Sequence, residues 1–442
     1  MAEYTLTQLE AWNGKIEALA REEGLDCYEQ HFDIVGYDDM LCYEAYLGMP
    51  SHYPHWVFGK AYERRRTFYR HNLAGLPYEM VINSDPCQAY LMRDNSLLLQ
   101  ILTMAHVYGH NDFFKNNRLF RRDTTAAAAV AMFKAHANRV RKYAQDPAIG
   151  PQAVERVIDA AHALRTQVSR HGQPLVAGRR EMKHEGARQV PDRLKGSLLA
   201  FLAERGPLAD WERDVVSIVH DEALYFIPQM ETKILNEGWA SFWHYRLMRR
   251  LGLPQSLYLE FLQRHNLIVS PHPYMVNPYF LGFRMFSHLE KTYGLKALMD
   301  IRADERDQSF LRRYLTRELC EELQLYTYAM EGYSIVIRDV ADDKGWRAVR
   351  DALVRSAGLG DVPTVRPAAV EKGVLLLEHD YDGRELEMSY AKETLKHVVE
   401  LWRAPVELLT WAQGRQIIVR CNEDKLISVP ISTPTEYFQA YV

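Results

Sequence analysis

Two apolar stretches of this sequence contain side chains that a protein interior rarely holds. They are SLLLQILTMAHVYGH, residues 96–110, and IVHDEALYFIPQMETKILNEGWASFWHYRL, residues 218–247. Both are apolar enough to be buried, yet each carries imidazoles or carboxylates, whose burial costs free energy unless they are paired or functional. We therefore expect the fold to be organised around these two stretches.

Helical periodicity dominates both stretches. Ser96 and the Asp and Asn before it are good N-cap residues, and the apolar side chains that follow surround the helix on all sides. This pattern predicts a central helix that ends at His110. The second stretch predicts a helix over 210–226 that Pro228 stops, and another helix from about 231 to 250.

Most of the remaining chain before residue 360 also predicts helices. A loop-rich cover with one helix near 60–70 is expected between residues 31 and 90, and the polar segment 172–195 predicts a mobile connection. Asn277 and Pro278 have the pattern of an N-cap and a first helical residue. The other helices are expected over 4–30, 124–170 and 278–293, with further helical pattern to about 330.

The sequence pattern changes after Pro363. The segments GVLLLEHDYDGREL and GRQIIVRCNEDKLISVPIS predict hairpins that turn at Asp382-Gly383 and at Asn422-Glu423. A helix over 392–402 is expected between them.

Length and composition allow a large core. The chain has 442 residues, of which 47% are hydrophobic and 25% charged, as is usual for globular proteins. We predict a mainly α protein with a large helical body over residues 1–360, which carries the candidate site, and a small α+β module over residues 361–442.

Charge, cysteines and motifs exclude several classes of protein. The net charge is −4 without long runs of one sign, which argues against nucleic acid or an anionic membrane as a partner. Five cysteines without a CxxC pair, and no leader or apolar run of ~18 residues, predict a soluble cytoplasmic protein with reduced thiols. Walker, GxGxxG, GxSxG and paired-cysteine zinc motifs are absent from the sequence.

His106 and His110 are one helical turn apart, so that both imidazoles can reach one divalent ion. With 17 histidines in 442 residues, one such spacing is unsurprising by chance. The alternative interpretation is that both rings donate hydrogen bonds to backbone carbonyls at the end of a buried helix.

Glu237 strengthens the hypothesis of a metal site. On a helix it shares a face with Lys233, Ser241 and His244, and it could complete a set of two histidines and one carboxylate. Such a set leaves an open position on the metal for water or substrate. The alternative is an intrahelical ion pair between Lys233 and Glu237.

Glu222 is a second unusual carboxylate, because its helical neighbours form an apolar face. Burial would raise its pKa and allow it to act as a general base near neutral pH. The alternative is that an arginine or tyrosine from another helix binds it.

Several other polar residues allow both a functional and a structural interpretation. Asn111 and Asp112 could orient a ligand imidazole or cap the end of the helix. Arg284 lies one turn from His288 and could bind a substrate carboxylate, although a structural ion pair is the simpler interpretation.

Three blocks of sequence resemble the stage V sporulation protein R (SpoVR) family: HVYGHNDFFKNN, PQMETKILNEGWASFWHY and HPYMVNPYFLG. The resemblance extends through most of the chain. It implies a bacterial cytoplasmic protein, named for a role in forming the spore cortex but also common in bacteria that make no spores. It further implies an association with a PrkA-type serine protein kinase and a stress-linked protein.

The ligand arrangement is also similar to that of gluzincin-type zinc metallopeptidases. Those enzymes place HExxH on one helix and a third ligand in an EGxA-like segment of a later helix, which His106, His110 and Glu237 match here. The resemblance implies that these residues hold zinc. Val107, however, stands where the general-base glutamate of HExxH would be.

Three functions follow from these patterns. In the first, the protein is a zinc-dependent amide hydrolase with Glu222 as base and His244 as additional ligand or oxyanion stabiliser. In the second, it is a non-enzymatic regulator or scaffold of the kinase, and the C-terminal module serves partner binding or dimerisation. In the third, two histidines and one carboxylate bind iron, as in non-haem oxygenases.

Overall fold

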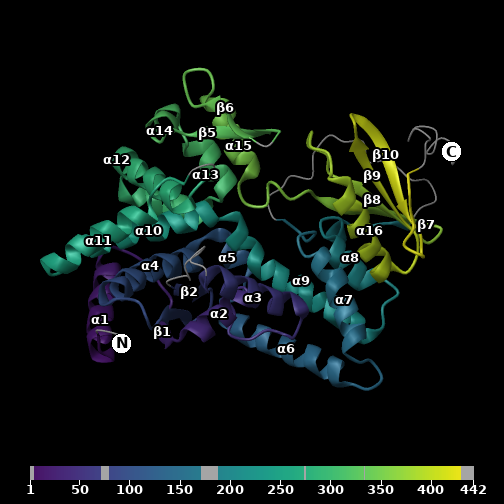
Figure 1. Ribbon diagram of the computed structural model, residues 1–442, viewed down its shortest axis with the longest axis horizontal. Coiled ribbons are helices and arrows are strands. Elements are labelled where there is room, and N and C mark those ends of the chain that lie inside the picture. Colours follow the sequence, from purple (N-terminus) through teal and green to yellow (C-terminus); the bar gives the residue numbers. More distant parts are fainter. Residues whose placement is uncertain (1–3, 71–78, 171–187, 273–274, 333, 430–442) are drawn as a thin grey trace. The chain divides into compact units, whose positions relative to one another are not determined.

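The computed structural model describes residues 4–70, 79–170, 188–272, 275–332 and 334–429 (Figure 1). The chain forms two compact units, each built from separate segments of sequence. The first unit comprises residues 1–52, 56–134 and 228–361, and the second comprises residues 53–55, 135–227 and 362–442. Most of the segment predicted as a mobile connection, 172–195, lies outside the described residues.

Helices dominate the first unit. Its helices before residue 134 are α1 (Leu6–Glu22), α2 (Tyr37–Ala45), α3 (Trp56–Arg70), α4 (Leu97–Asn116) and α5 (Arg118–Asp123). Its later helices are α10 (Lys233–Arg250), α11 (Gln255–Ile268), α12 (Pro278–Asp304), α13 (Asp307–Tyr314), α14 (Arg317–Glu322) and α15 (Trp346–Ser356). The predicted N-caps are confirmed, since Ser96 caps α4 and Asn277 caps α12.

Helix α4 is the centre of this unit, as predicted. Every residue from Leu98 to Phe114 is buried, because α1, α10, α11 and α12 all pack against the helix. The fold is mainly α with a small α+β region near the C-terminus, which confirms the predicted class. Within the described residues, no helix has the length and hydrophobicity that a bilayer-spanning segment needs.

The segment predicted as a loop-rich cover contains a small sheet instead. Its strands are β1 (Gln30–Val35), β2 (Glu79–Ile82) and β3 (Cys87–Met92), in the order β1-β3-β2. Strands β1 and β3 are parallel, whereas β2 and β3 are antiparallel. The prediction missed these strands because they are short and hold little alternation of polar and apolar residues.

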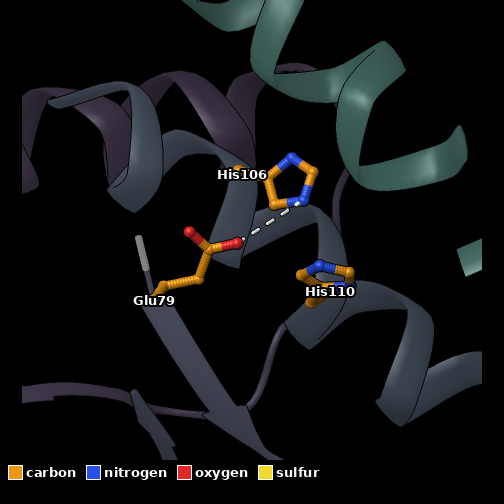
Figure 2. A group of neighbouring side chains, drawn as sticks. All are labelled: Glu79, His106 and His110. Atoms are coloured by element: carbon orange, nitrogen blue, oxygen red, sulfur yellow. Dashed lines mark ion pairs between the residues drawn. The ribbon is translucent and has the colours of Figure 1, made fainter. Parts of the chain in front are cut away.

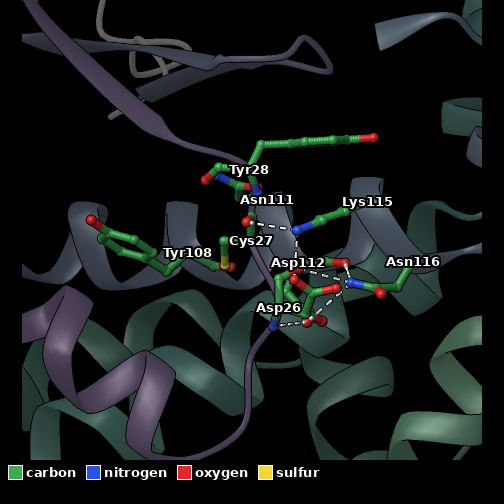
Figure 3. Close-up of polar contacts among 8 residues, drawn as sticks. All are labelled: Asp26, Cys27, Tyr28, Tyr108, Asn111, Asp112, Lys115 and Asn116. Carbon is green, nitrogen blue, oxygen red and sulfur yellow. Dashed lines mark hydrogen bonds and ion pairs between the residues drawn. The ribbon is translucent and has the colours of Figure 1, made fainter. Parts of the chain in front are cut away.

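Side chains of α4 attach this sheet to the central helix (Figure 3). The backbone N–H of Asp26 donates to Asp112 Oδ1 at 2.9 Å, and that of Tyr28 donates to Asn111 Oδ1 at 2.7 Å. Asp112 also accepts a hydrogen bond from Trp239 of α10 at 2.9 Å. Both side chains therefore hold neighbouring segments in place, and through β1 and β3 they position β2.

The helical pattern predicted up to residue 330 is wrong at its end. Residues 326–340 form an antiparallel hairpin of β5 (Tyr326–Glu331) and β6 (Ser334–Val340). Strand β5 contains Tyr and Thr and strand β6 contains Ile and Val, and these residue types favour β structure.

Within the described residues, the second unit holds all or most of five α-helices and a six-stranded sheet. Its elements before residue 231 are α6 (Ala129–Gln145), α7 (Pro151–Ala163), β4 (Arg188–Gln189), α8 (Leu198–Arg205) and α9 (Asp210–Glu231). Its C-terminal elements are β7 (Val365–Glu371), β8 (Val374–His379), α16 (Met388–Trp402), β9 (Val406–Ala412), β10 (Arg415–Cys421) and β11 (Ile427–Ser428). The sheet has the order β11-β10-β9-β8-β7-β4.

Two local predictions in this region need correction. Strand β8 pairs with the preceding β7 across Lys372-Gly373, so the hairpin does not turn at Asp382-Gly383. Helix α9 continues through Pro228 to Glu231, although a proline removes one backbone hydrogen bond from the helix. The predicted turn at Asn422-Glu423 does connect two paired strands, β10 and β11.

Small residues allow α4, α10 and α12 to approach closely. A Cβ atom on Gly109 would lie 2.6 Å from Ala240 Cα, and one on Gly238 would lie 2.4 Å from Gly282 Cα. No real side chain tolerates such distances, so the backbones are in direct contact at both places. Gly109 lies between His106 and His110, and Gly238 follows Glu237, so the contacts lie beside the candidate ligands.

A buried carboxylate fixes the start of α10. Thr232 gives no side-chain hydrogen bond to the cap, and the backbone N–H groups of Ile234 and Leu235 donate to Asp307 at 2.9 and 2.8 Å. Asp307 thus replaces a local N-cap and sets the position of the first turn of α10.

We predict that Gly109→Ala lowers the free energy of unfolding by about 1–3 kcal/mol, because the new methyl group must push α10 away from α4. Chemical denaturation measures this change. Gly14→Ala is the matched control, since a Cβ on this helical glycine meets nothing within 4 Å. It should be neutral or stabilise by up to about 1 kcal/mol. Equal effects of both substitutions would contradict the close packing.

Candidate metal centre

The carboxylate of Glu237 lies between the two imidazoles of α4. Its Oε2 atom is 3.4 Å from His110 Nε2 and 3.6 Å from His106 Nε2. The structure thus brings the three residues of the predicted metal set together within the first unit. Lys233 is exposed, and within the described residues no ion pair joins it to Glu237, so the alternative pairing is not formed.

Neighbouring side chains fix the orientation of both rings. His110 Nδ1 is 2.9 Å from Asn236 Oδ1, a contact in which the ring nitrogen donates. His106 Nδ1 is 2.9 Å from His244 Nδ1, and His244 Nε2 is 2.8 Å from His265 Nδ1. With its Nδ1 atom bound in this way, each of the two α4 rings presents Nε2 to Glu237.

Two polar atoms at the centre of this cluster have no hydrogen-bond partner. They are His106 Nε2 and Glu237 Oε2, both buried. An unsatisfied buried polar atom is costly, and two that face each other at 3.6 Å leave room for an ion between them. Imidazole nitrogens and a carboxylate oxygen are the donors that zinc prefers, so the residues fit a divalent metal.

A fourth residue, Glu79, was not predicted. It begins β2, and Figure 2 shows its carboxylate pointing toward the imidazoles of α4. Glu79 Oε1 is 3.9 Å from His106 Nε2, and the ligand atoms of Glu79, His106 and His110 lie within 4.8 Å of one another. The sequence contained one weak signal, a carboxylate directly before the apolar residues Met-Val-Ile, but no spacing links it to the histidines.

The pKa values of the two carboxylates differ strongly. Burial and, to a smaller extent, the negative charge of Glu237 raise the pKa of Glu79 to about 7, although His110 acts to lower it. Burial alone would also raise the pKa of Glu237, but the close approach of His106 and His110 holds it well below its usual range. Near neutral pH, Glu237 is an anion and Glu79 exchanges protons readily.

The pKa values of the imidazoles differ as well. Burial lowers the pKa of His106 to about 4, although Glu237 acts against it. Burial acts on His110 in the same direction, but the nearby carboxylate of Glu237 outweighs it and the pKa of His110 is raised. The pKa of His244 is well below its ordinary value because of burial and the neighbouring histidines. The cluster therefore favours neutral His106 and His244, and a neutral imidazole is the form that binds metal.

The two predicted catalytic residues lie in different surroundings. His244 is fully buried next to His106, where both of its ring nitrogens have imidazole partners. Glu222 belongs to the second unit, where its Oε1 atom is 3.1 Å from His136 Nδ1. The described contacts give His244 an orienting position and Glu222 an imidazole partner. Their catalytic roles stay predictions.

Comparison with known proteins identifies the family. A model described as "SpoVR like protein" matches residues 3–190 and 173–362, and one described as "SpoVR-like C-terminal domain" matches residues 372–413. This chain belongs to the SpoVR family. The resemblance noted from the three sequence blocks is thereby confirmed, and the four residues of the candidate metal centre lie within the first SpoVR match and its continuation.

A SpoVR relative from Escherichia coli (strain K12), the uncharacterized protein YcgB, is 30% identical to this chain. The similarity covers 92% of each protein, so the two share both the main SpoVR region and the C-terminal region. No solved structure matches the chain.

The opposite pKa shifts of Glu237 and His110 make the stability of the metal-free protein depend on pH. The raised pKa of His110 means that its pairing with Glu237 stabilises the fold below pH 6.5 and is lost as the pH rises through the folded pKa. We therefore expect the stability of the wild type relative to Glu237→Gln to fall as the pH rises above 6.5. Urea denaturation with chelator present measures it. A constant difference would contradict the ion pair.

Proposed function

We propose that this protein is a metal-dependent hydrolase of amide bonds. His106, His110 and Glu237 would hold a divalent ion, with zinc as the first choice. The observation that supports the proposal most is the convergence of three side chains from two helices on buried, unpartnered Nε2 and Oε2 atoms. Sets of two histidines and one carboxylate occur in catalytic zinc sites, where a position stays open.

The residues around the ligands support a catalytic rather than a purely structural ion. A bound zinc ion supplies Lewis acidity, which polarises a carbonyl and makes water a nucleophile near neutral pH. Structural zinc sites are closed by four protein ligands, often cysteines, whereas here the fourth neighbour, Glu79, has a raised pKa of about 7. Asn236 and His244 would keep the ligand rings in orientation.

We propose Glu79 as the general base that Val107 cannot provide. Its carboxylate lies on the strand side of the ligand cluster, 3.9 Å from His106 Nε2. It would accept a proton from the attacking water and return that proton to the leaving amine nitrogen. Glu79 is preferred to Glu222 because it lies within the same unit as the ligands, whereas the carboxylate of Glu222 has His136 as its partner.

The proposed substrate class is an amide of peptidoglycan type or of a peptidoglycan precursor. Its support is the role in spore cortex formation that the family resemblance implies. Hydrolysis of muropeptides, followed by mass spectrometry, tests the class directly. If the protein binds metal but cleaves none of these amides, the result supports the metal site and contradicts the proposed reaction.

Metal content tests the ligand set independently of any substrate. We expect about one equivalent of zinc in the purified wild type and less than about a tenth of an equivalent in His110→Ala and in Glu237→Ala, because a set of three ligands cannot lose one and keep its affinity. Plasma mass spectrometry measures it. His52→Ala is the control, since this histidine is buried in the same unit but packs on Phe58. Metal retained by both ligand variants would refute the set.

If Glu79 is the general base, replacing it should lower turnover without removing the metal. Glu79→Gln should keep its metal and lower kcat by about 10²–10⁴-fold, because the amide cannot take up a proton. Glu44→Gln is the matched control, since its side chain is 19% exposed, similar to the 16% of Glu79, and pairs with Arg65. Unchanged kcat in Glu79→Gln would assign the base elsewhere.

A further inference from the structure

The first unit contains a large cavity that the proposed reaction does not use. Its volume is about 1130 Å³, large enough for a small organic molecule. Residues of α10, α11 and α12 form most of the lining. None of the four residues of the candidate metal centre belongs to it.

Part of the lining is aromatic and apolar. The apolar side chains that line the cavity are Phe242, Tyr245, Leu262, Val269, Phe280 and Phe283. Several of these rings pack on one another and on His265, as in the contacts of Tyr245 and Phe283 with this histidine at 4.6 and 4.8 Å between ring centroids. The aromatic surface is therefore rigid and suits a flat, apolar group.

The polar part of the lining is rich in cations. Its charged residues are Arg246, Arg249, Arg250, Arg284, Lys291, Glu290 and Glu322. Five cations face two carboxylates, and a cation-rich concave surface concentrates anions.

Three of the five cations already have carboxylate partners. Arg284 pairs with Glu322, which makes it the structural ion pair considered from the sequence. Arg246 bridges Glu23 and Glu290, and Arg250 also pairs with Glu23. These arginines are held in place by their partners and form a fixed wall rather than a mobile rim.

Arg249 and Lys291 differ from the other three. Within the described residues, no ion pair joins either of them to a carboxylate. The guanidinium of Arg249 lies 5.5 Å from the centre of the Tyr245 ring, which is itself part of the lining. Two cations of the cavity thus keep their charge available for a ligand, and one of them is held over an aromatic surface.

Polar uncharged groups complete the lining. Asn266 and Ser287 contribute an amide and a hydroxyl group, which can donate hydrogen bonds to oxygen atoms, whereas the hydroxyl of Ser270 donates to the backbone carbonyl of Leu267. Arginine, lysine and hydroxyl donors next to aromatic rings are the combination that binds carboxylates and phosphates carried by an apolar body.

We propose that this cavity binds a small organic anion, with its carboxylate or phosphate held by Arg249 and Lys291 and its apolar body on the aromatic lining. This site is separate from the metal centre and does not depend on the proposed hydrolysis. The two sites do share one chain of contacts, because His265 lines the cavity and hydrogen-bonds His244, the partner of His106.

Isothermal titration calorimetry with four probes tests the proposal on the full chain, with metal and after chelation. Phenyl phosphate and phenylacetate combine charge with an aromatic ring, inorganic phosphate has charge alone, and benzyl alcohol has the ring alone. We expect at least one of the two aromatic anions to bind at one site, both with metal and after chelation. Its Kd should be at least tenfold lower than that of inorganic phosphate or of benzyl alcohol. The comparison of phenyl phosphate with phenylacetate tells phosphate from carboxylate ligands.

Substitutions locate the binding. Arg249→Ala and Lys291→Ala should each weaken binding of the aromatic anion by about tenfold and leave binding of benzyl alcohol unchanged. Arg347→Ala is the control for the first, since Arg347 is also exposed and lies over an aromatic ring, Trp346, outside the cavity. Lys296→Ala is the control for the second, because it lies on the same helix and is exposed.

Three outcomes would overturn the proposal. The first is that no probe binds. The second is that benzyl alcohol binds as tightly as the anions, which would make the cavity a purely apolar site. The third is that the control substitutions weaken binding as much as Arg249→Ala and Lys291→Ala, which would place the anion elsewhere on the surface. Failure of the metal-content test would leave all of these measurements unaffected.

Discussion

The close contact of three helix backbones is the constraint on which the first unit depends. Because Gly109 has no side chain, Ala240 of α10 contacts the backbone of α4. In the same way, Gly238 allows Gly282 of α12 to contact the backbone of α10. Larger residues at these positions would separate the helices and, with them, the two histidines from Glu237. Asp307 adds a second constraint, because it holds the first turn of α10, one turn before Glu237. The geometry of the polar cluster is thus set by packing outside it.

The polar cluster itself is expensive to bury. Glu237 is an anion in an interior position, and its main compensation is a pair of imidazoles at 3.4 and 3.6 Å. Without a cation between them, two buried polar atoms stay unsatisfied, and such a state is usual at functional sites rather than in structural cores. The hydrogen bonds that the far sides of the rings form with Asn236 and His244 add to this view, because they orient the rings without satisfying the central atoms.

Local sequence patterns predicted the long elements well and the short ones poorly. The N-caps at Ser96 and Asn277 start helices as expected, since capping depends on a few neighbouring residues. The strands β1, β2 and β3 were missed, and residues 326–330 were expected to be helical although they form most of strand β5. Strand pairing depends on partners far away in the sequence, and a short strand contains too little periodicity to reveal them.

The sequence pattern was enough to predict that α4 is buried and carries two imidazoles on one face, because a 3.6-residue repeat places positions four apart together. It also singled out Glu237 as their partner and identified the SpoVR family. Three features became visible only in the folded chain: Glu79 joins the cluster, Asn111 and Asp112 hold segment 26–28, and a cation-rich cavity lies between α10, α11 and α12. Each of these features joins residues from separate elements, and their approach follows from packing that no local pattern encodes.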